Sequence, residues 1–320
     1  MSAILAIRGL TTRFATPDGE VAAVSDVDLD LRAGETLGVV GESGSGKSQL
    51  FLSVLGLLAR NGRATGSARL DGQELIGLAP ESLRRVRGGR IAMIFQDPMT
   101  SLNPFLTVGR QLTEGPMLHR GLDERTARAR AIAMLERVRI PDAARRLNQY
   151  PHEFSGGMRQ RIMIAMALLP EPDVLIADEP TTALDVTVQA QILDLLRELR
   201  ASMGIATVLI THDLGVVAGL CDRVTVMYAG RVVEEAPVEP LFGAPAHPYT
   251  RALLGALPRV DADGAHDLVA IPGQPPNLQR VIEGCAFAPR CAQADARCTA
   301  TRPGLRAHGA GRAACLRLPS

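Results

Sequence analysis

The sequence predicts an α/β fold with a largely parallel sheet, an N-terminal antiparallel β part and a C-terminal extension. Three observations predict it. Short apolar strands alternate with helical segments, as they do around buried parallel sheets. A glycine-rich turn joins one of these strands directly to a helix. After about residue 244, prolines and glycines cluster and four of the five cysteines appear. We therefore expect a main domain at residues 1–245, with a helical subdomain at about 99–168, and an extension at 246–320.

The periodicity of the apolar residues places the elements along the chain. Strand-like alternation covers 3–10 and 21–35, and an apolar strand at 36–40 precedes the glycine-rich turn. The other elements expected are a helix at 48–58, a mostly helical region from 105 to 168, a strand beginning at 173, a helix at 187–200 and a strand beginning at 206.

The composition limits the classes of protein that this chain can belong to. With 46% hydrophobic and 22% charged residues among 320, it suits a soluble globular protein with a sizeable core. The formal net charge of +1 gives no electrostatic reason to expect nucleic acid or an anionic membrane surface as a partner. The longest apolar runs, such as 174–177 and 206–210, are far shorter than the roughly 20 residues of a membrane span. The first ten residues lack the pattern of a signal peptide, so we expect a cytoplasmic protein whose cysteines stay reduced unless they hold a metal.

The turn 41-GESGSGKS-48 fits the phosphate-binding pattern G-x-x-x-x-G-K-S in the required context, between a strand and a helix. Among 35 lysine and arginine residues, Lys47 is the one lysine. Its compact charge on a flexible stem suits the β- and γ-phosphates of ATP, whereas a planar guanidinium has another shape. The Ser48 hydroxyl is expected to bind Mg²⁺. The residues expected to bind ATP here are Gly41, Ser43, Gly44, Ser45, Gly46, Lys47, Ser48 and Gln49.

A pair of carboxylates closes the apolar strand in 173-DVLIADEP-180. Asp178 is placed to hold the Mg²⁺ shell, and Glu179 to polarise the attacking water as a general base. An Asp–Glu pair at the end of a strand is common by chance. The phosphate loop upstream favours the catalytic interpretation.

A Ser-Gly-Gly turn opens a helix at 154-FSGGMRQR-161, shortly before that strand. Together the motifs resemble those of ABC-type ATPases, which implies a P-loop NTPase core of ABC type. In that family the signature of one subunit binds the γ-phosphate of ATP held by the other subunit. Phe154 and Met158 stand where the family commonly has Leu and Gln. The alternative is an ordinary glycine-containing helix cap. The residues to which the resemblance assigns the signature role are Ser155, Gly156 and Gly157.

Four further residues match motifs of the family, and the resemblance implies their roles. Gln96 corresponds to the glutamine that contacts Mg²⁺ and water and senses the membrane partner. His212, at the end of the next strand, corresponds to the histidine that contacts the γ-phosphate and positions Glu179. Asp185 belongs to the loop that crosses the dimer interface, and Phe14 matches the aromatic residue that stacks on adenine. The alternatives are a structural histidine for His212 and a core residue for Phe14.

One chain carries one phosphate loop and one signature, so the resemblance implies a dimer with an identical or homologous ATPase subunit. Such a dimer holds two ATP molecules between facing motifs. ATP binding closes the dimer and hydrolysis reopens it, which drives the membrane permeases by two-state switching.

Three longer stretches, 96–112, 150–168 and 247–258, resemble the ATP-binding subunits of bacterial importers for di- and oligopeptides. That branch also includes importers of nickel, glutathione and some sugars. It implies two transmembrane permease subunits, an extracellular substrate-binding protein that acts indirectly, and a peripheral position on the cytoplasmic face of the bacterial cell membrane. The groove beside Gln96 and the segment 99–150 are expected to receive a short helix from each permease.

Four cysteines gather near the C-terminus within 31 residues: Cys285, Cys291, Cys298 and Cys315. Their spacing, C-x₅-C-x₆-C-x₁₆-C, matches no simple C-x₂-C zinc pattern. This segment resembles the C-terminal extension of peptide-importer ATPases, and four thiolates can hold a [4Fe–4S] cluster. Three alternatives stay open: an iron–sulfur cluster, a zinc ion, or reduced thiols without metal. Cys221 stands apart and is expected to be a buried structural thiol.

The function expected is therefore the ATP-hydrolysing motor of a membrane importer, most directly one for di- or oligopeptides. A soluble P-loop phosphotransferase does not explain 155-SGG-157 and His212 in this order. A non-transport ABC ATPase acting on DNA or ribosomes usually carries two cassettes or long coiled-coil insertions, and this sequence shows neither.

Overall fold

Two units make up the chain, and each combines segments that are distant in sequence. The computed structural model describes residues 3–96, 101–182, 184–256 and 271–318. Unit 1 contains Met1–Ala3, Leu31–Glu35 and Gly77–Leu209, and unit 2 contains Ile4–Asp30, Thr36–Ile76 and Ile210–Ser320.

Three strands of unit 1 lie in the order β8-β7-β6. β6 (Ile91–Ile94) and β7 (Val174–Asp178) pair in parallel, and β8 spans Ala206–Ile210. Every residue of β7 and β8 is buried, which explains their nearly continuous apolar sequence. Both strands begin within one residue of where the sequence predicts them.

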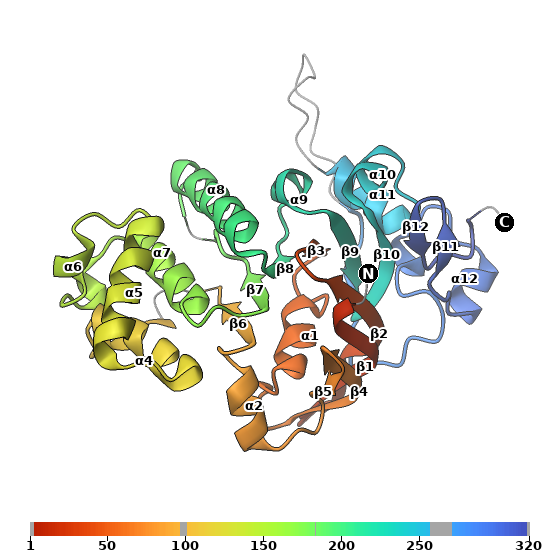
Figure 1. Cartoon of the computed structure of the whole chain (residues 1–320). Helices are drawn as coiled ribbons and strands as arrows, with labels where there is room; N and C mark the ends of the chain where they lie inside the picture. The colour runs from red at the N-terminus through yellow and green to blue at the C-terminus, as the bar shows by residue number, and fades with distance from the viewer. Residues whose placement is uncertain (1–2, 97–100, 183, 257–270, 319–320) are drawn as a thin grey trace, which may run out of the picture. The chain divides into compact units, whose positions relative to one another are not determined.

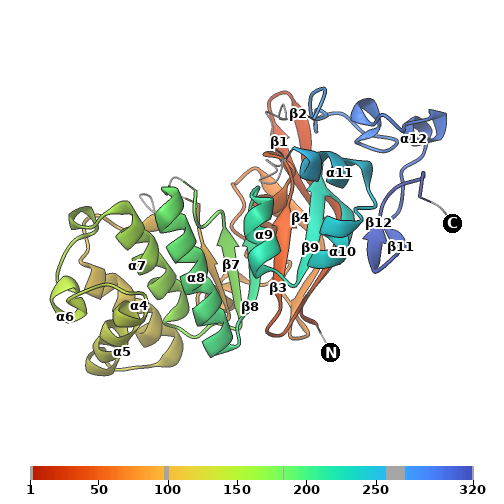
Figure 2. The same ribbon diagram turned by 90° about the horizontal axis from the view of Figure 1, so that it is seen from above.

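The helices of unit 1 form its larger part, and their packing confirms the helical character expected between 105 and 168. Figure 2 shows α7 and α8 side by side, with α4 and α5 next to α7. Their shared core includes Leu112, Leu135 and Ile162, each at most 1% exposed. The helices are α2 (Pro80–Val86), α4 (Val108–Arg120), α5 (Glu124–Arg137), α6 (Ala143–Arg146), the 3₁₀ turn η1 (Pro151–Glu153), α7 (Gly156–Leu168) and α8 (Val186–Met203).

An antiparallel sheet opens unit 2, as the sequence predicts. Its first strand is longer than the predicted 3–10, and its second begins and ends two to three residues before the predicted 21–35. Its order is β2-β1-β4-β5, and β1 pairs with β4 from Leu5↔Leu70 to Phe14↔Gly62. The strands are β1 (Ala3–Thr16), β2 (Gly19–Arg32), β4 (Gly62–Leu70) and β5 (Gln73–Glu74).

The other strands of unit 2 lie in the order β11-β12-β10-β9-β3. β3 (Thr36–Val40) pairs in parallel with β9 (Arg223–Tyr228), and β10 (Arg231–Pro237) returns antiparallel to β9. Tyr228 and Tyr249 are buried in the core beside these strands. The helices here are α1 (Lys47–Val54), α9 (Leu214–Leu220), α10 (Val238–Gly243) and α11 (Pro248–Gly255).

The C-terminal extension adds strands to this sheet, so it is part of unit 2. β12 (Gly311–Ala313) pairs antiparallel with β10, and β11 (Arg306–His308) pairs with β12 (Figure 1). A 3₁₀ turn, η2 (Ala288–Arg290), and a short helix, α12 (Ala296–Ala300), precede them.

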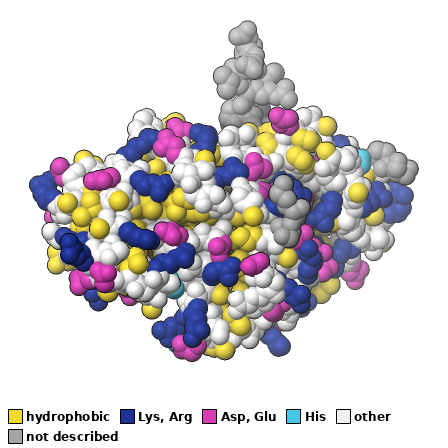
Figure 3. Space-filling model, in the orientation of Figure 1, with side chains coloured by type: hydrophobic (Ala, Val, Ile, Leu, Met, Phe, Trp, Pro, Cys, Tyr) yellow, Lys and Arg dark blue, Asp and Glu magenta, His cyan; other side chains and the backbone are white. Residues whose placement is uncertain are grey.

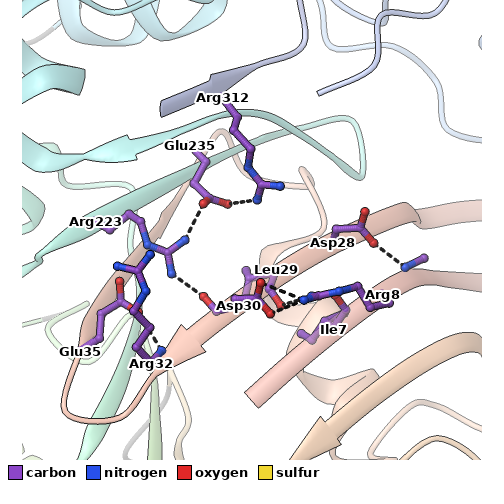
Figure 4. Close-up of polar contacts among 11 residues, drawn as sticks. Ile7, Arg8, Asp28, Leu29, Asp30, Arg32, Glu35, Arg223, Glu235 and Arg312 are labelled. Carbon is purple, nitrogen blue, oxygen red and sulfur yellow. Dashed lines mark hydrogen bonds and ion pairs between the residues drawn. The ribbon is translucent and has the colours of Figure 1, made fainter. Parts of the chain in front are cut away.

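A partly buried ionic network joins the extension to the sheet (Figure 4). Glu235 of β10 accepts hydrogen bonds from Arg223 Nη1 of β9 at 2.5 Å and from Arg312 Nη2 of β12 at 2.9 Å. Arg223 also donates to the backbone carbonyl of Asp30 in β2. The side chains of Arg223 and Glu235 are each 10% exposed, so removal of one partner would leave a buried charge without compensation.

Acidic and basic side chains are interspersed on the face seen in Figure 3, in keeping with the small net charge. Within the described residues, no helix combines the length and apolar character that crossing a bilayer requires.

Candidate functional site

The phosphate loop connects β3 to α1 in unit 2, and glycine is required at two of its positions. Gly41 and Gly46 have φ values of 151° and 97°, in a region that other residues rarely adopt. A Cβ atom on Gly41 would lie 2.2 Å from the Met227 carbonyl oxygen, and one on Gly46 would lie 2.3 Å from the Ala23 carbonyl oxygen. Neighbouring backbone therefore leaves no room for a side chain at either position.

Lys47 begins α1 and is buried inside the loop, at 7% exposure. Its Nζ donates to the carbonyl oxygens of Gly41 at 2.8 Å and Glu42 at 3.0 Å. Gly46 is the N-cap of α1, and no side chain caps the helix. An N-terminus of this kind, with a buried lysine beside it, suits an anion such as a phosphate group.

The other residues predicted in the loop differ in exposure. Ser43 and Gly44 are exposed, whereas Ser48 and Gln49 at the start of α1 are half-buried. The Ser45 hydroxyl is buried and has no hydrogen-bond partner in the described structure. A buried polar atom within this glycine-lined loop is consistent with a polar ligand.

Phe14 and His212 also belong to unit 2. Phe14 is half-buried on β1 and its ring lies over Gly62, where an added Cβ would approach it to 2.6 Å. His212 is exposed in the turn between β8 and α9. The preceding residue, Thr211, donates its backbone N–H to the Val39 carbonyl at 3.2 Å. This bond brings the His212 turn beside the strand that leads into the phosphate loop.

The predicted carboxylates lie in unit 1, at the end of β7. Asp178 is buried and Glu179 is half-buried. Gln96 Nε2 donates to Glu179 Oε2 at 3.1 Å, and Thr182 Oγ1 donates to the same oxygen at 2.8 Å. Glu179 has a φ of 47°, a left-handed conformation that is uncommon for a residue with a side chain. Such conformations concentrate at functional sites, where the surroundings maintain them.

Two contacts of this site do not follow from the sequence alone. The first is the bond from Thr182 to Glu179. A threonine three positions after a carboxylate can bond to it across a turn, and this spacing is the only feature of the sequence that suggests the contact. Gln160, in the middle of α7, donates from Nε2 to the Pro180 carbonyl at 2.6 Å and is 2% exposed. The helix that begins with the Ser-Gly-Gly turn therefore also supports the segment after Glu179.

The predicted signature forms the N-terminus of α7. Ser155 is the N-cap, with its hydroxyl accepting from the Met158 N–H at 3.4 Å, and Gly156 is exposed beside it. A Cβ on Gly157 would lie 2.7 Å from a methyl group of Val188 in α8. Asp185 caps that helix and is exposed. The structure thus presents Ser155, Gly156 and Asp185 to the surface of unit 1.

Comparison with known proteins decides the family. The model of the ABC transporter family matches residues 24–182, and that of the oligopeptide/dipeptide transporter C-terminal region matches residues 233–298. The chain is 55% identical to the oligopeptide transport ATP-binding protein OppD of Salmonella typhimurium, over 97% of this chain and 92% of OppD. The chain is 56% identical to the oligopeptide transport ATP-binding protein OppD of Haemophilus influenzae, over 93% of this chain and 92% of that protein. The chain belongs to the ABC transporter ATP-binding subunits. It is accordingly an ATPase coupled to transport, in the branch that carries the oligopeptide/dipeptide C-terminal region.

Solved structures agree with this assignment to the ABC family. A dimeric post-hydrolysis state of the ATP-binding cassette MJ0796, bound to ADP and Pi, is 28% identical, with a TM-score of 0.66 over 73% of this chain and 98% of that chain. The structure of cbiO1 of Clostridium perfringens, described as part of the ABC transporter complex cbiONQ, is 30% identical, with a TM-score of 0.64 over 76% of this chain and 92% of that chain. The predicted ABC-type fold is confirmed.

The cysteines of this ABC subunit differ in part from expectation. Cys298 and Cys315 are buried, Cys285 and Cys291 are half-buried, and none forms a disulfide. Burial, and then the neighbouring thiols Cys298 and Cys315, raise the pKa of both Cys285 and Cys291. Within the described residues, no three His, Cys, Asp or Glu side chains are arranged to hold a metal, so the structure gives the predicted iron–sulfur cluster no support.

Cys221 is half-buried and packs against the core of unit 2, so it is less buried than the sequence predicts. It follows the end of α9, where the chain turns towards β9, and its sulfur lies near Gly38, where an added Cβ would approach it to 3.1 Å. Parts of the predicted stretches 96–112 and 247–258, and residue 183 in the loop before Asp185, lie outside the described residues.

Proposed function

We propose that this ABC subunit is the ATP-hydrolysing motor of an importer for di- or oligopeptides. One observation carries the proposal: one chain holds a phosphate loop, a Ser-Gly-Gly helix start and the C-terminal region of oligopeptide/dipeptide transporters. The OppD proteins to which it is similar are oligopeptide transport ATP-binding proteins.

The phosphate loop is proposed to bind the ATP phosphates. Its backbone N–H groups at the start of α1 face the anion, and Lys47 moves its Nζ from the Gly41 and Glu42 carbonyls towards the β- and γ-phosphates. Ser48, Asp178 and Gln96 are the proposed ligands or near neighbours of Mg²⁺, which neutralises charge on the phosphates when bound. Phe14 is proposed to stack on the adenine.

Glu179 is proposed to orient and deprotonate the attacking water. Its Oε2 accepts from both Gln96 and Thr182, so two donors fix the direction of the carboxylate. His212 is proposed to contact the γ-phosphate and to help position Glu179. Because Gln96 lies on the segment expected to meet a permease, a shift of that segment would change the orientation of the base.

A second ATPase subunit, identical or homologous, is proposed to complete each site. The exposed N-terminus of α7 offers Ser155 and Gly156 to a phosphate held by another chain, and exposed Asp185 lies on the same unit. Val186, next to Asp185, is 83% exposed.

Unit 1 is also proposed to carry the surface for the two permeases. Phe105 is 87% exposed, and Phe95 and Tyr150 are about two-fifths exposed at 42% and 40%. These aromatic side chains lie in or beside the segment expected to receive a permease helix. The proposal places the subunit at the cytoplasmic face of the cell membrane, with an extracellular binding protein as an indirect partner and no nucleic acid.

The tail cysteines are proposed to ligate a [4Fe–4S] cluster, with zinc or metal-free thiols as the alternatives. The support comes from the sequence: the four cysteines fall within 31 residues of the extension, and four thiolates can hold such a cluster. Anaerobic purification followed by iron, sulfide and zinc analysis decides between the three. About four iron and four sulfide per chain would support the cluster, and their absence would reject it.

The transport proposal is tested by co-expressing the chain with its permeases and binding protein and reconstituting the complex in vesicles. We expect a defined tri- or tetrapeptide to stimulate ATP hydrolysis and to accumulate inside. If Ni²⁺ or glutathione stimulates hydrolysis instead, the chain is still the motor of an importer, but the transported solute is not a peptide. Turnover that no solute and no permease alters would favour a non-transport ATPase.

A further inference from the structure

We propose that Arg290 of the C-terminal extension is a positioning residue for the phosphate loop, acting through Glu42. Arg290 Nη1 lies 2.7 Å from Glu42 Oε2, and Arg290 Nη2 lies 2.9 Å from Glu42 Oε1. The two residues are 248 positions apart and both belong to unit 2. The arginine side chain is 4% exposed and the glutamate side chain 27%. A partly buried, two-point pair of this kind is among the stronger interactions of protein side chains.

The guanidinium of Arg290 has an acceptor for each of its five N–H groups. Besides the two bonds to Glu42, Nε donates to the Pro272 carbonyl at 2.9 Å, Nη2 to the Ile271 carbonyl at 3.2 Å, and Nη1 to Tyr228 Oη at 3.2 Å. Its planar group therefore has a single orientation. A lysine has three donors on a flexible stem and cannot reproduce this set.

Aromatic rings pack around the same arginine, and a third ring residue, Tyr249, makes a second contact to Glu42 through its hydroxyl. The Arg290 guanidinium carbon lies 5.8 Å from the Tyr228 ring centre and 5.9 Å from that of Phe287. Tyr249, fully buried in α11, packs against both rings and accepts the Glu42 backbone N–H on its hydroxyl at 2.8 Å. The backbone and the carboxylate of Glu42 are thus held by different parts of the C-terminal third of the chain.

Glu42 transmits this support to the phosphate-binding lysine. Its carbonyl oxygen accepts from Lys47 Nζ at 3.0 Å and from the Ser45 N–H at 3.2 Å. Displacement of Glu42 therefore moves an acceptor of Lys47 and the turn that carries Ser45. Among the described residues, Arg290 bonds to none of those that we assign to ATP, so its effect on ATP passes through Glu42. The inference rests on the proposed function of this loop as the ATP site.

The role can be measured in the full-length chain with Mg²⁺ and ATP as the probe. Arg290→Gln and Glu42→Gln should each weaken ATP binding and raise the KM for ATP roughly 10- to 100-fold, with a smaller change in kcat. The double variant should be no weaker than either single variant, because both remove the same interaction. Arg290→Lys, which keeps the charge but loses the two-point geometry, should fall between Arg290→Gln and the unchanged chain.

Arg312→Gln is the matched control. This substitution also breaks an ion pair between an arginine of the extension and a carboxylate, that of Glu235. Glu235 belongs to β10 and not to the phosphate loop. The substitution should lower the thermal stability and leave the ATP affinity unchanged. If Arg290→Gln folds and behaves in the same way, the proposal is wrong. If Arg290→Gln does not fold, Glu42→Gln decides, because it keeps the side-chain shape: an unchanged KM overturns the proposal. Absence of ATP binding by the unaltered chain would instead reject the proposed function.

Discussion

Gln96 and Thr182 both donate hydrogen bonds to one oxygen of Glu179, at 3.1 and 2.8 Å. The first donor follows β6 and the second follows β7, so the carboxylate is oriented from two neighbouring strands of unit 1. The conformation of Glu179, with a φ of 47°, is maintained by this arrangement.

Replacement of Glu179 by glutamine tests its role as the base. The amide keeps the shape of the side chain but cannot accept a proton, so we expect kcat to fall by roughly 10²- to 10⁴-fold. ATP binding should persist, and the ATP-bound dimer should accumulate. Phosphate release and size-exclusion chromatography in ATP measure the two effects. A variant with nearly unchanged turnover would show that another group activates the water.

Thr182→Val tests the orienting hydrogen bond, because valine has the shape of threonine without its hydroxyl. Loss of a hydrogen bond to a carboxylate should lower kcat by roughly tenfold. Thr181→Val, one residue earlier, is the matched control and should leave kcat nearly unchanged. If both substitutions lower kcat equally, the hydrogen bond from Thr182 to Glu179 does not explain the loss of activity.

Gly46→Ala tests the fit of the phosphate loop against its neighbours. The new methyl group would collide with the Ala23 carbonyl and would require an unfavourable φ, so we expect a loss of about 2–4 kcal/mol in the free energy of unfolding. ATP binding should also be lost. Gly121, which ends α4 with a φ of 64°, has no atom within 4 Å of an added Cβ.

Gly121→Ala therefore isolates the conformational cost, about 1–2 kcal/mol, and should leave ATP binding unchanged. Chemical denaturation and an ATP titration separate the two positions. Normal ATP affinity in Gly46→Ala would contradict the proposed closeness of fit.

His247 predicts a pH dependence of stability. Burial, and then the charge of Arg251, lower its pKa from 6.5 to about 4, and its Nδ1 accepts from the Tyr249 N–H. The side chain of Glu234 accepts a hydrogen bond from the backbone N–H of His247 at 2.8 Å. The unfolded chain takes up a proton at a higher pH than the folded chain. The contribution of His247 to the free energy of unfolding is therefore fully present above pH 6.5. Up to about 3 kcal/mol of it is lost as the pH falls to 4.

His247→Asn is the control for this titration, because an asparagine oxygen can replace the capping acceptor without taking up a proton. The difference in unfolding free energy between the two proteins should narrow as the pH falls from 6.5 to 4. A difference that stays constant over this range would assign the acid sensitivity to other groups.

The sequence predicts the elements around the phosphate loop well because local patterns determine them. Lys47 stands out as the single lysine, and its loop has a fixed spacing between a strand and a helix. Ser155 and Asp185 likewise follow the local rules for helix starts, and the structure places both as N-caps. Such signals act within a few residues, so one sequence is sufficient to find them.

The contacts between distant segments do not follow from the sequence. Arg290 is one arginine among many, and nothing in its neighbourhood distinguishes it from a solvent-exposed one. Its partner Glu42 occupies a variable position of the loop pattern. The strands β11 and β12 have three residues each, too few for any alternation to be visible, and their pairing depends on β10. The left-handed backbone of Glu179 arises from its tertiary surroundings.

The distance in sequence between Glu42 and Arg290 has a consequence for synthesis of the protein. The loop leaves the ribosome early, whereas the arginine that supports it is made 248 residues later. Nascent chains and chains shortened at the C-terminus therefore lack this support even when the loop itself is complete. The order of translation delays complete formation of the proposed nucleotide site until nearly the whole polypeptide has been released.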